Sequence, residues 1–518
     1  MTSELRKHAS NNSSSPPLTP AAPRELNRRL GLEDTAFLFL ESDESPSNVG
    51  SVAIFEGNMS FDRFLENVSS KMHLVPRYRQ RVVGAPFNAA RPTWEDDPDF
   101  DIRRHIRRLR LDAPGTLDDL MNLAARIHEG KMDRSKPLWE IYIVEGLEGD
   151  RTGMINKVHH CLVDGIAGIE LLMITLDFSP EPAPAPPPER DYSPAPIPSW
   201  RTLLRDAIFD QTSEVIDRWA DFQQSLVDLV SGEGSRWKAI RSAVGLAIPY
   251  FSVPAEPMPL NGKLSGKRKL ATTAISFKEV REIRKAVGGT VNDVVLTALA
   301  GALSRYIESH GESTAGRSVR VVTPVNVRSD GEAGLLGNNI SMLIVETPVG
   351  IDDPIERLAE ISQRTTRLKE SRAAEGVRAI SDALLSAPPP VIAALGRAGV
   401  GINNLGNLVC TNVPGPMIPL YAVGHRMLAH YPIAPIVFDM GANVAVMSYD
   451  GMLYFGLVAD RNAADDVHVL RDFLDEAYAE LRDAAGVGTH PPIEIIRPTE
   501  AVTDNVDALA RAGNRTNG

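Results

Sequence analysis

A proline-rich segment at residues 179–199 constrains the fold most, because it divides the 518-residue chain into two parts. Its density of Pro, Ala and Glu favours an extended connector over a packed helix or strand. A chain of this length exceeds one ordinary domain, so at least two are expected. We predict a disordered tail (1–24), an N-terminal domain (25–178), a linker with connecting helices (179–265), a C-terminal domain (266–485) and a flexible tail (486–518).

Apolar spacing predicts a mixture of helices and strands in both parts, and hence an α/β protein. The N-terminal part should contain strands at 51–55, 138–147 and 154–160, and helices at 61–72, 117–128 and 166–178. Two helices, 200–230 and 237–251, should follow the proline-rich segment. The C-terminal part should contain strands at 270–276, 319–327, 408–410, 443–448 and 453–459, and helices at 278–287, 291–307 and 472–482. Residues 412–416 are predicted to form a rigid turn and residues 449–452 a hairpin turn.

Two adjacent histidines, His159 and His160, lie where the predicted strand 154–160 meets the predicted helix 166–178. A neutral imidazole, with a pKa near ~6.5, can take a proton from a hydroxyl group at neutral pH. His160 is therefore the candidate general base. Successive side chains of a strand point to opposite faces, so one of the two histidines should pack in the core unless the pleat breaks between them.

Asp164 and Gly165 complete this segment, whose sequence from residue 159 is HHCLVDG. Asp164 would orient the imidazole or anchor the loop to a distant cation, and Gly165 suits a tight backbone turn. A histidine on an apolar segment is more often a core residue than a functional one, and that alternative stays open here. A zinc site is disfavoured, because adjacent histidines on opposite faces make poor joint ligands and no third ligand cluster is apparent. We therefore expect no metal.

The HHCLVDG segment resembles the HHxxxDG signature of the bacterial wax ester synthase/diacylglycerol acyltransferase family, within the wider HxxxD acyl-CoA-dependent acyltransferases. The resemblance covers most of the chain, from about residue 26 to residue 482. Other stretches agree in the same order: 32–38, 132–140, 292–293, 324–328, 337–338 and 412–416. One departure is residues 47–50, Ser-Asn-Val-Gly, where the family usually has Met-His-Val-Gly.

The resemblance implies a two-domain, chloramphenicol-acetyltransferase-like α/β fold with the catalytic loop at the domain interface. It also implies transfer of an acyl group from acyl-CoA, used as a substrate with no cofactor, to diacylglycerol or a long-chain alcohol. His160 would deprotonate the acceptor hydroxyl and return the proton to the departing thiolate. No acyl-enzyme is expected, because neither Cys161 nor a serine occupies a nucleophile elbow. Two alternatives remain: an HxxxD acyltransferase for a glycolipid or polyketide alcohol, and a non-catalytic lipid-droplet-binding protein.

Further site residues follow from the same resemblance. Asn292 and Asp293 would lie at the active site, with Asn292 donating to the oxyanion, although a carboxylate in the first turn of a helix also has a purely structural explanation. Arg328 is the candidate ion-pair partner of Asp164. Trp139 and Asn412 are expected to give structural support.

The net charge of −12 argues against a nucleic-acid partner, because phosphate binding needs a basic surface. Two cysteines, Cys161 and Cys410, suit a reducing compartment. The first 23 residues resemble a disordered tail more than a signal peptide, and no stretch offers the ~20 apolar residues of a spanning helix. We expect a cytoplasmic protein, with peripheral attachment to the inner membrane or to lipid inclusions left open.

Two groups of arginines precede the histidine segment. They would bind the phosphates of CoA or an anionic lipid surface, or they would simply form a solvated face. The groups are Arg77, Arg79 and Arg81, and then Arg103, Arg104, Arg107, Arg108 and Arg110.

Overall fold

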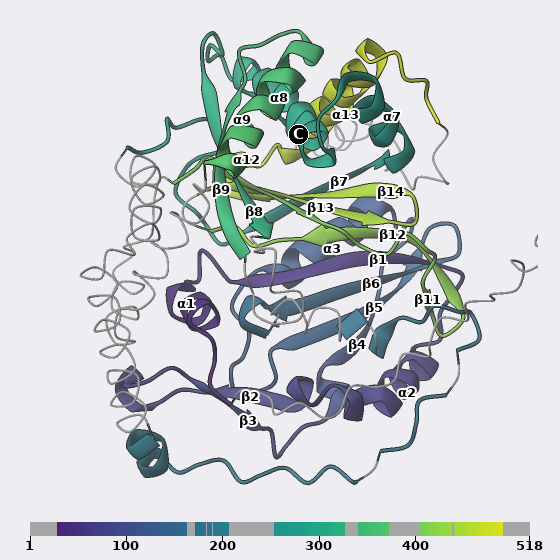
Figure 1. Cartoon of the computed structure of the whole chain (residues 1–518). Coiled ribbons are helices and arrows are strands. Elements are labelled where there is room, and N and C mark those ends of the chain that lie inside the picture. Colours follow the sequence, from purple (N-terminus) through teal and green to yellow (C-terminus); the bar gives the residue numbers. More distant parts are fainter. Residues whose placement is uncertain are drawn as a thin grey trace, which may run out of the picture.

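Two six-stranded sheets, stacked one above the other, form the framework of the protein (Figure 1). The structure is a computed structural model that describes residues 28–162, 171–172, 174–182, 184–188, 190–206, 253–326, 340–371, 405–437 and 440–490. Each sheet belongs mainly to one half of the sequence. The exceptions are strands β11 and β12, described below, and the predicted domain boundaries stay predictions.

The first sheet has the strand order β11-β12-β1-β6-β5-β4. All neighbouring pairs are antiparallel except β4 and β5. A separate two-stranded sheet pairs β2 with β3. The strands are β1 (Asn48–Glu56), β2 (Gln80–Val83), β3 (Thr93–Asp96), β4 (Ile106–Arg110), β5 (Trp139–Leu147), β6 (Arg151–His159), β11 (Tyr421–Ala422) and β12 (His425–Ile433).

Helices of the N-terminal half accompany this sheet. They are α1 (Leu32–Leu40), α2 (Phe61–Lys71) and α3 (Leu117–His128), with short 3₁₀ turns η1 (Met72–Leu74), η2 (Pro76–Arg79), η3 (Pro86–Asn88), η4 (Ile102–Arg104) and η5 (His160–Leu162). Helix α3 begins at a capping box in which the Thr116 hydroxyl accepts the Asp119 N–H and the Asp119 carboxylate accepts the Thr116 N–H. It packs on β1, β5 and β6 and also contacts β7 of the second sheet.

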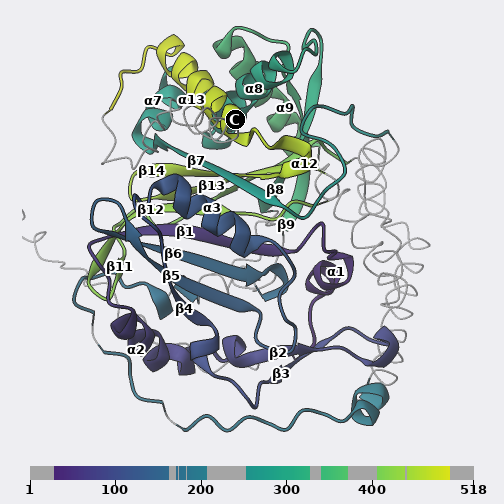
Figure 2. The ribbon, with the colours of Figure 1, turned by 180° about the vertical axis from the view of Figure 1, so that it is seen from behind.

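The second sheet has the order β7-β14-β13-β10-β8-β9, and β10 runs parallel to both β8 and β13. Its strands are β7 (Arg268–Ser276), β8 (Ser318–Asn326), β9 (Ile340–Pro348), β10 (Leu408–Val413), β13 (Ala442–Tyr449) and β14 (Met452–Asp460). The helices α7 (Phe277–Val287), α8 (Val291–Ser309), α9 (Pro354–Glu370), α12 (Arg461–Ala464) and α13 (Val467–Ala484) belong to this half. Of these, α7, α8, α9 and α13 lie on the side of the second sheet away from the first (Figures 1 and 2).

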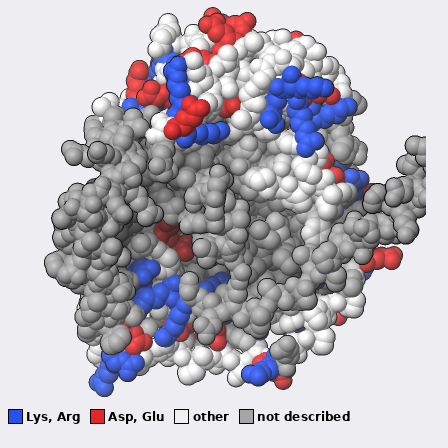
Figure 3. Space-filling model, in the orientation of Figure 1, with Lys and Arg blue, Asp and Glu red and all other residues white. Residues whose placement is uncertain are grey.

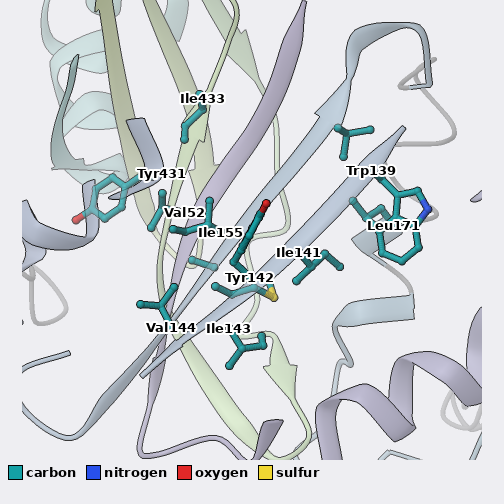
Figure 4. Packing of buried hydrophobic residues seen from close by; sticks show 14 of the residues in the cluster. Val52, Trp139, Ile141, Tyr142, Ile143, Val144, Ile155, Leu171, Tyr431 and Ile433 are labelled. Atoms are coloured by element: carbon teal, nitrogen blue, oxygen red, sulfur yellow. The ribbon is translucent and has the colours of Figure 1, made fainter. Parts of the chain in front are cut away.

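Strands β11 and β12 are the exceptions to the division by sequence order, because both come from the C-terminal half but belong to the first sheet. Strand β12 pairs with β1, with Val52 opposite Tyr431 and Gly50 opposite Ile433. Figure 4 shows Tyr431 and Ile433 packed in the same apolar cluster as Val52 and Ile155. Strand β12 also contacts β13 and β14, so it joins the two sheets.

Most predicted elements are present, with small changes of boundary. Helix α3 begins and ends where the spacing predicted, and Thr290 caps α8 through a capping box with Asp293. The predicted hairpin turn is a two-residue loop, Asp450-Gly451, in which both residues have positive φ (42° and 84°), as its composition requires. The predicted turn at residues 412–416 was wrong at its start: β10 extends to Val413, because Asn412 and Val413 continue the parallel ladder with β13.

Among the described residues, no single helix is long and apolar enough to cross a membrane; α7 and α8 meet that test only as a pair, bent by 97° at the break between them. The predicted helix at 237–251 lies outside the described residues, as do residues 207–230 of the predicted helix at 200–230 and residues 166–170 and 173 of the predicted helix at 166–178. The predicted end of the latter helix was wrong: helical structure stops at Thr175, because Asp177 pairs with Tyr421 in an isolated β-bridge.

Candidate active site

The two predicted histidines lie at the end of β6, where the strand pleat breaks. His159 is the last residue of β6, opposite Asn48 of β1, and His160 begins the 3₁₀ turn η5. The backbone is held on both sides: the His159 N–H donates to the Leu138 carbonyl (3.0 Å) and the His160 N–H donates to the Ser47 carbonyl (2.8 Å). Because the pleat ends between them, the two rings have different environments.

His159 is a core residue bound to a buried carboxylate. Its side chain is 1% exposed, and its Nε2 lies 3.4 Å from Oε1 of Glu41, whose side chain is 0% exposed. This distance is longer than a strong hydrogen bond, and the contact lacks hydrogen-bond geometry, so we regard it as mainly electrostatic. The His159 Nδ1 accepts the backbone N–H of Cys161 (3.1 Å). Since Nδ1 is an acceptor, the ring proton of neutral His159 is on Nε2, beside Glu41.

Glu41 is held as a carboxylate by three groups. Burial by itself would raise its pKa, but His159, the Arg134 guanidinium and the Ser47 N–H together lower the pKa below its ordinary value. The Arg134 Nη2 donates to Oε2 (2.7 Å) and the Ser47 N–H donates to Oε1 (3.1 Å). Glu41 is therefore a fixed negative charge beside the histidine pair.

His160 has the properties of a neutral, available imidazole. The residue as a whole is partly exposed, its Nδ1 is buried, and its ring stacks on Phe37 of α1, with centroids 3.7 Å apart and planes inclined by 19°. Its Nδ1 has no hydrogen-bond partner among the described residues. Burial and, secondarily, the neighbouring His159 lower the pKa of His160 to about 4. The ring is therefore uncharged at neutral pH and able to accept a proton.

Trp139 is a core residue of β5, the strand beside β6. It lies opposite Val158 in β5 and is fully buried, and its indole N–H donates to the Tyr78 carbonyl (2.8 Å). The His105 ring stacks on it with centroids 4.6 Å apart. These contacts hold Trp139 in the core, and its predicted support of the site stays a prediction.

Asn48, which replaces the histidine usual in the resembling family, links β1 to the end of α3. Its Nδ2 donates to the carbonyls of His128 (3.0 Å) and Gly130 (2.8 Å). A neutral histidine carries a single N–H and could not make both bonds. The departure from the family pattern therefore has a local packing role.

Asn292 and Asp293 lie in the first turn of α8, in the second half of the protein. Asp293 is buried, caps the helix through Thr290 and accepts the hydroxyl of Thr365 from α9 (2.7 Å). The Asn292 Oδ1 is buried and has no hydrogen-bond partner among the described residues. Asp293 thus has the structural role considered above, and the oxyanion role of Asn292 stays a prediction.

Three predicted site residues, Asp164, Gly165 and Arg328, lie outside the described residues, so their predicted roles stay predictions. Asn412 lies on β10, opposite Val446 of β13. Cys161 is buried, and burial raises the pKa of its thiol well above the ordinary value, which opposes formation of a nucleophilic thiolate.

The predicted arginine groups are largely engaged within the protein. Arg107 pairs with Glu140, while Arg108 and Arg110 pair with Glu145. Arg77 lies over the Trp94 ring and Arg79 over the Tyr192 ring. On the coloured part of the face in Figure 3, basic and acidic side chains lie beside one another in several places. For Arg107, Arg108 and Arg110 these contacts favour the solvated-face alternative over a phosphate site.

Three residues of the site were missed by sequence reasoning: Glu41, Ser47 and Arg134. Glu41 and Ser47 are six positions apart, whereas Arg134 lies 93 positions beyond Glu41 and reaches it only in the folded chain. The available signals were that Arg134 lies within a stretch, 132–140, that resembles the family, and that Ser47 begins the stretch 47–50 that departs from it.

Comparisons with known proteins identify the family of the chain. A family model for the wax ester synthase/diacylglycerol acyltransferase catalytic domain matches residues 30–295, and one for the WS/DGAT C-terminal domain matches residues 336–482. Two proteins of Mycobacterium tuberculosis, described as "Probable diacyglycerol O-acyltransferase" tgs1 and tgs2, are each 30% identical to this chain. The matches cover 84% and 88% of this chain and 90% and 98% of those proteins.

Solved structures show the same fold. A wax ester synthase/diacylglycerol acyltransferase from Marinobacter aquaeolei VT8 has a TM-score of 0.60 at 22% identity, covering 89% of this chain and 100% of that one. The first condensation domain of the calcium-dependent antibiotic synthetase has a TM-score of 0.55 at 14% identity, covering 90% and 100%. These matches confirm the predicted chloramphenicol-acetyltransferase-like α/β fold, and the family models with the 30%-identical relatives establish the lineage: the chain belongs to the wax ester synthase/diacylglycerol acyltransferase family of acyltransferases.

Proposed function

We propose that the protein transfers a long-chain acyl group from acyl-CoA to the free hydroxyl of diacylglycerol, forming triacylglycerol. Long-chain alcohols are the second acceptor class, giving wax esters. The observation that carries the proposal is the neutral imidazole of His160, a residue that is not fully buried and directly follows β6, in a chain that belongs to this family. The relatives described as diacylglycerol O-acyltransferases support the choice of diacylglycerol as acceptor.

In the proposed mechanism, His160 takes the proton of the acceptor hydroxyl as its oxygen attacks the thioester carbonyl carbon. The resulting tetrahedral oxyanion collapses, the carbon–sulfur bond breaks, and the imidazolium returns its proton to the thiolate to release CoA. Asn292, whose amide lies in the first turn of α8, is the proposed oxyanion donor. The buried thiol of Cys161 supports direct transfer without an acyl-enzyme. The reaction as written needs no cofactor.

Incubation of the purified full-length chain with radiolabelled palmitoyl-CoA tests this function. The acceptor panel contains dioleoylglycerol, hexadecanol, a glycolipid and a no-acceptor control. We expect labelled triacylglycerol with an equimolar release of CoA, and a smaller wax ester signal. Labelled product only with the glycolipid would overturn the proposed acceptors, and the absence of ester with every acceptor would overturn the function.

The pKa of His160 predicts an unusual pH dependence. A general base must be unprotonated, so kcat/KM falls as the pH drops through its pKa. Because the pKa of His160 is lowered to about 4, we expect kcat/KM to be flat between pH ~5 and ~7 and to fall towards pH 4. Circular dichroism at each pH verifies that the protein stays folded. A half-maximal rate near pH ~6.5, the ordinary value for histidine, would contradict the prediction.

A further inference from the structure

We propose that Glu41 is a positioning residue for acyl transfer. It fixes which ring nitrogen of His159 carries the proton, and through His159 it fixes the turn that presents His160. The inference rests on the proposed function, because it assigns His160 the role of base. Glu41 and His159 have side chains 0% and 1% exposed. They would therefore act through His160 and not directly on a substrate.

The turn that carries His160 depends on a side-chain acceptor. The Cys161 N–H, one residue beyond His160, donates to the His159 Nδ1 (3.1 Å). An imidazole nitrogen accepts only when it carries no proton, so this bond requires the tautomer protonated at Nε2. If the proton moved to Nδ1, two N–H groups would face each other and the turn would lose this bond. The conformation at residues 159–161 is thus coupled to one proton position.

Glu41 favours a proton on the His159 Nε2, and it also binds Ser47, the residue that accepts the His160 N–H. Its Oε1 lies 3.4 Å from the His159 Nε2, so its negative charge stabilises a proton there. The same oxygen accepts the Ser47 N–H (3.1 Å), and the Ser47 carbonyl accepts the His160 N–H (2.8 Å). The Glu41 Oε1 therefore contacts both residues that hold the backbone at His160: His159, whose ring accepts the Cys161 N–H, and Ser47, whose carbonyl accepts the His160 N–H.

Arg134 completes the arrangement by connecting Glu41 to the helix against which His160 stacks. Its Nη2 donates to the Glu41 Oε2 (2.7 Å) and to the Leu38 carbonyl of α1 (2.7 Å). Phe37, the preceding residue of α1, stacks on the His160 ring. The Ser47 hydroxyl also donates to the Phe37 carbonyl (3.3 Å). The ring and the backbone of His160 are therefore positioned by the same set of contacts around Glu41.

The substitution Glu41→Gln tests this role, because an amide cannot satisfy both neighbours. With its oxygen towards Ser47 and His159, the amide NH₂ faces the Arg134 guanidinium, donor against donor. With its oxygen towards Arg134, the NH₂ faces the Ser47 N–H and favours His159 protonated at Nδ1. We expect kcat to fall about 10- to 100-fold with KM changed less than about twofold, as for partners that orient a reacting group. The ¹⁵N spectrum of the His159 imidazole should show loss of the Nε2-protonated tautomer.

Matched variants separate positioning from general destabilisation. Asp43→Asn removes a nearby carboxylate whose side chain is 82% exposed and pairs with Lys131, and it should leave kcat and the His159 spectrum unchanged. Glu41→Asp keeps the charge and should recover part of the lost kcat. If Glu41→Gln does not fold, His159 itself is tested. His159→Asn retains an acceptor for the Cys161 N–H and should keep more activity than His159→Leu, which has none.

The inference is overturned if folded Glu41→Gln retains kcat within about twofold and an unchanged His159 spectrum, or if His159→Asn and His159→Leu are equally active. Its failure differs from failure of the proposed function. An inactive His160→Ala with a fully active Glu41→Gln would remove only the positioning role. An active His160→Ala variant would show that His160 is not the base. A change of the His159 tautomer in Glu41→Gln would even then show that Glu41 controls the conformation of the turn.

Discussion

Replacement of His160 by alanine should lower the rate of ester formation from acyl-CoA about 10²- to 10⁴-fold, the contribution typical of a positioned general base. The loss should appear in kcat, since the proton transfer occurs in the transition state. Folding should be retained, because His160 is not fully buried and its Nδ1 makes no hydrogen bond to the described residues, so its removal leaves no partner unsatisfied there. The measurement is the initial rate of triacylglycerol formation, together with a thermal melt.

His468 provides the matched control, because it is an exposed histidine on α13. His468→Ala should retain the full rate. A folded His160→Ala variant with a rate within tenfold of the unsubstituted protein would exclude His160 as the base. It would leave the family assignment intact, because that assignment rests on the whole chain.

Replacement of Arg268 by alanine should lower the free energy of unfolding by about 3–5 kcal/mol, the cost of breaking a buried ion pair from one side. Arg268 and Asp460 are opposite each other in β7 and β14, their side chains are 4% and 0% exposed, and Nη1 lies 2.6 Å from Oδ2. The Arg268 Nη2 also donates to the Glu44 carbonyl in the segment between α1 and β1 (2.8 Å). The substitution leaves a buried carboxylate without its cation and cuts a bond between the two halves.

Urea unfolding monitored by circular dichroism measures this effect. The comparison is Lys131→Ala, which breaks the pair with exposed Asp43 and should change the free energy of unfolding by less than about 1 kcal/mol. Equal stabilities of the two variants would show that neither the Arg268–Asp460 pair within the second sheet nor the Arg268–Glu44 bond between the halves contributes measurably to stability. The Arg268 side chain binds Glu44, which lies just before Ser47 in the chain. We therefore also expect Arg268→Ala to lose activity at a lower urea concentration than the one at which it unfolds.

Local elements were predictable where short-range chemistry determines them. Helix α3 has an apolar face and a capping box that begins at Thr116, so its ends follow from neighbouring residues. The Asp450-Gly451 loop is similarly local, since its positive φ values are accessible to Asp and Gly in a hairpin. At residues 412–416, by contrast, proline and glycine predicted a turn, but pairing with β13 extended the strand to Val413.

The candidate site was only partly predictable. The alternation of side chains along a strand indicated that only one of the two adjacent histidines packs in the core. The structure shows that this one is His159, because β6 ends there and His160 begins a 3₁₀ turn. The buried carboxylate beside His159 could not be inferred, because nothing in the pattern around Glu41 indicates a partner 118 positions away. Likewise, the arginine-rich segment suggested an anion site, whereas Glu140 and Glu145 on the adjoining strand pair with three of its members.

The sequence by itself determined the two α/β parts, most of their helices and strands, and the identity of the candidate base, because these depend on residue spacing and on side-chain chemistry. Only the tertiary structure decided which strands are neighbours. Strand β12 leaves its own half to pair with β1, and Glu41, Ser47 and Arg134 converge around His159. The physical reason is that periodicity records which face of an element is buried but not what covers that face. The partners of a buried charge or strand edge are fixed only when the whole chain has folded.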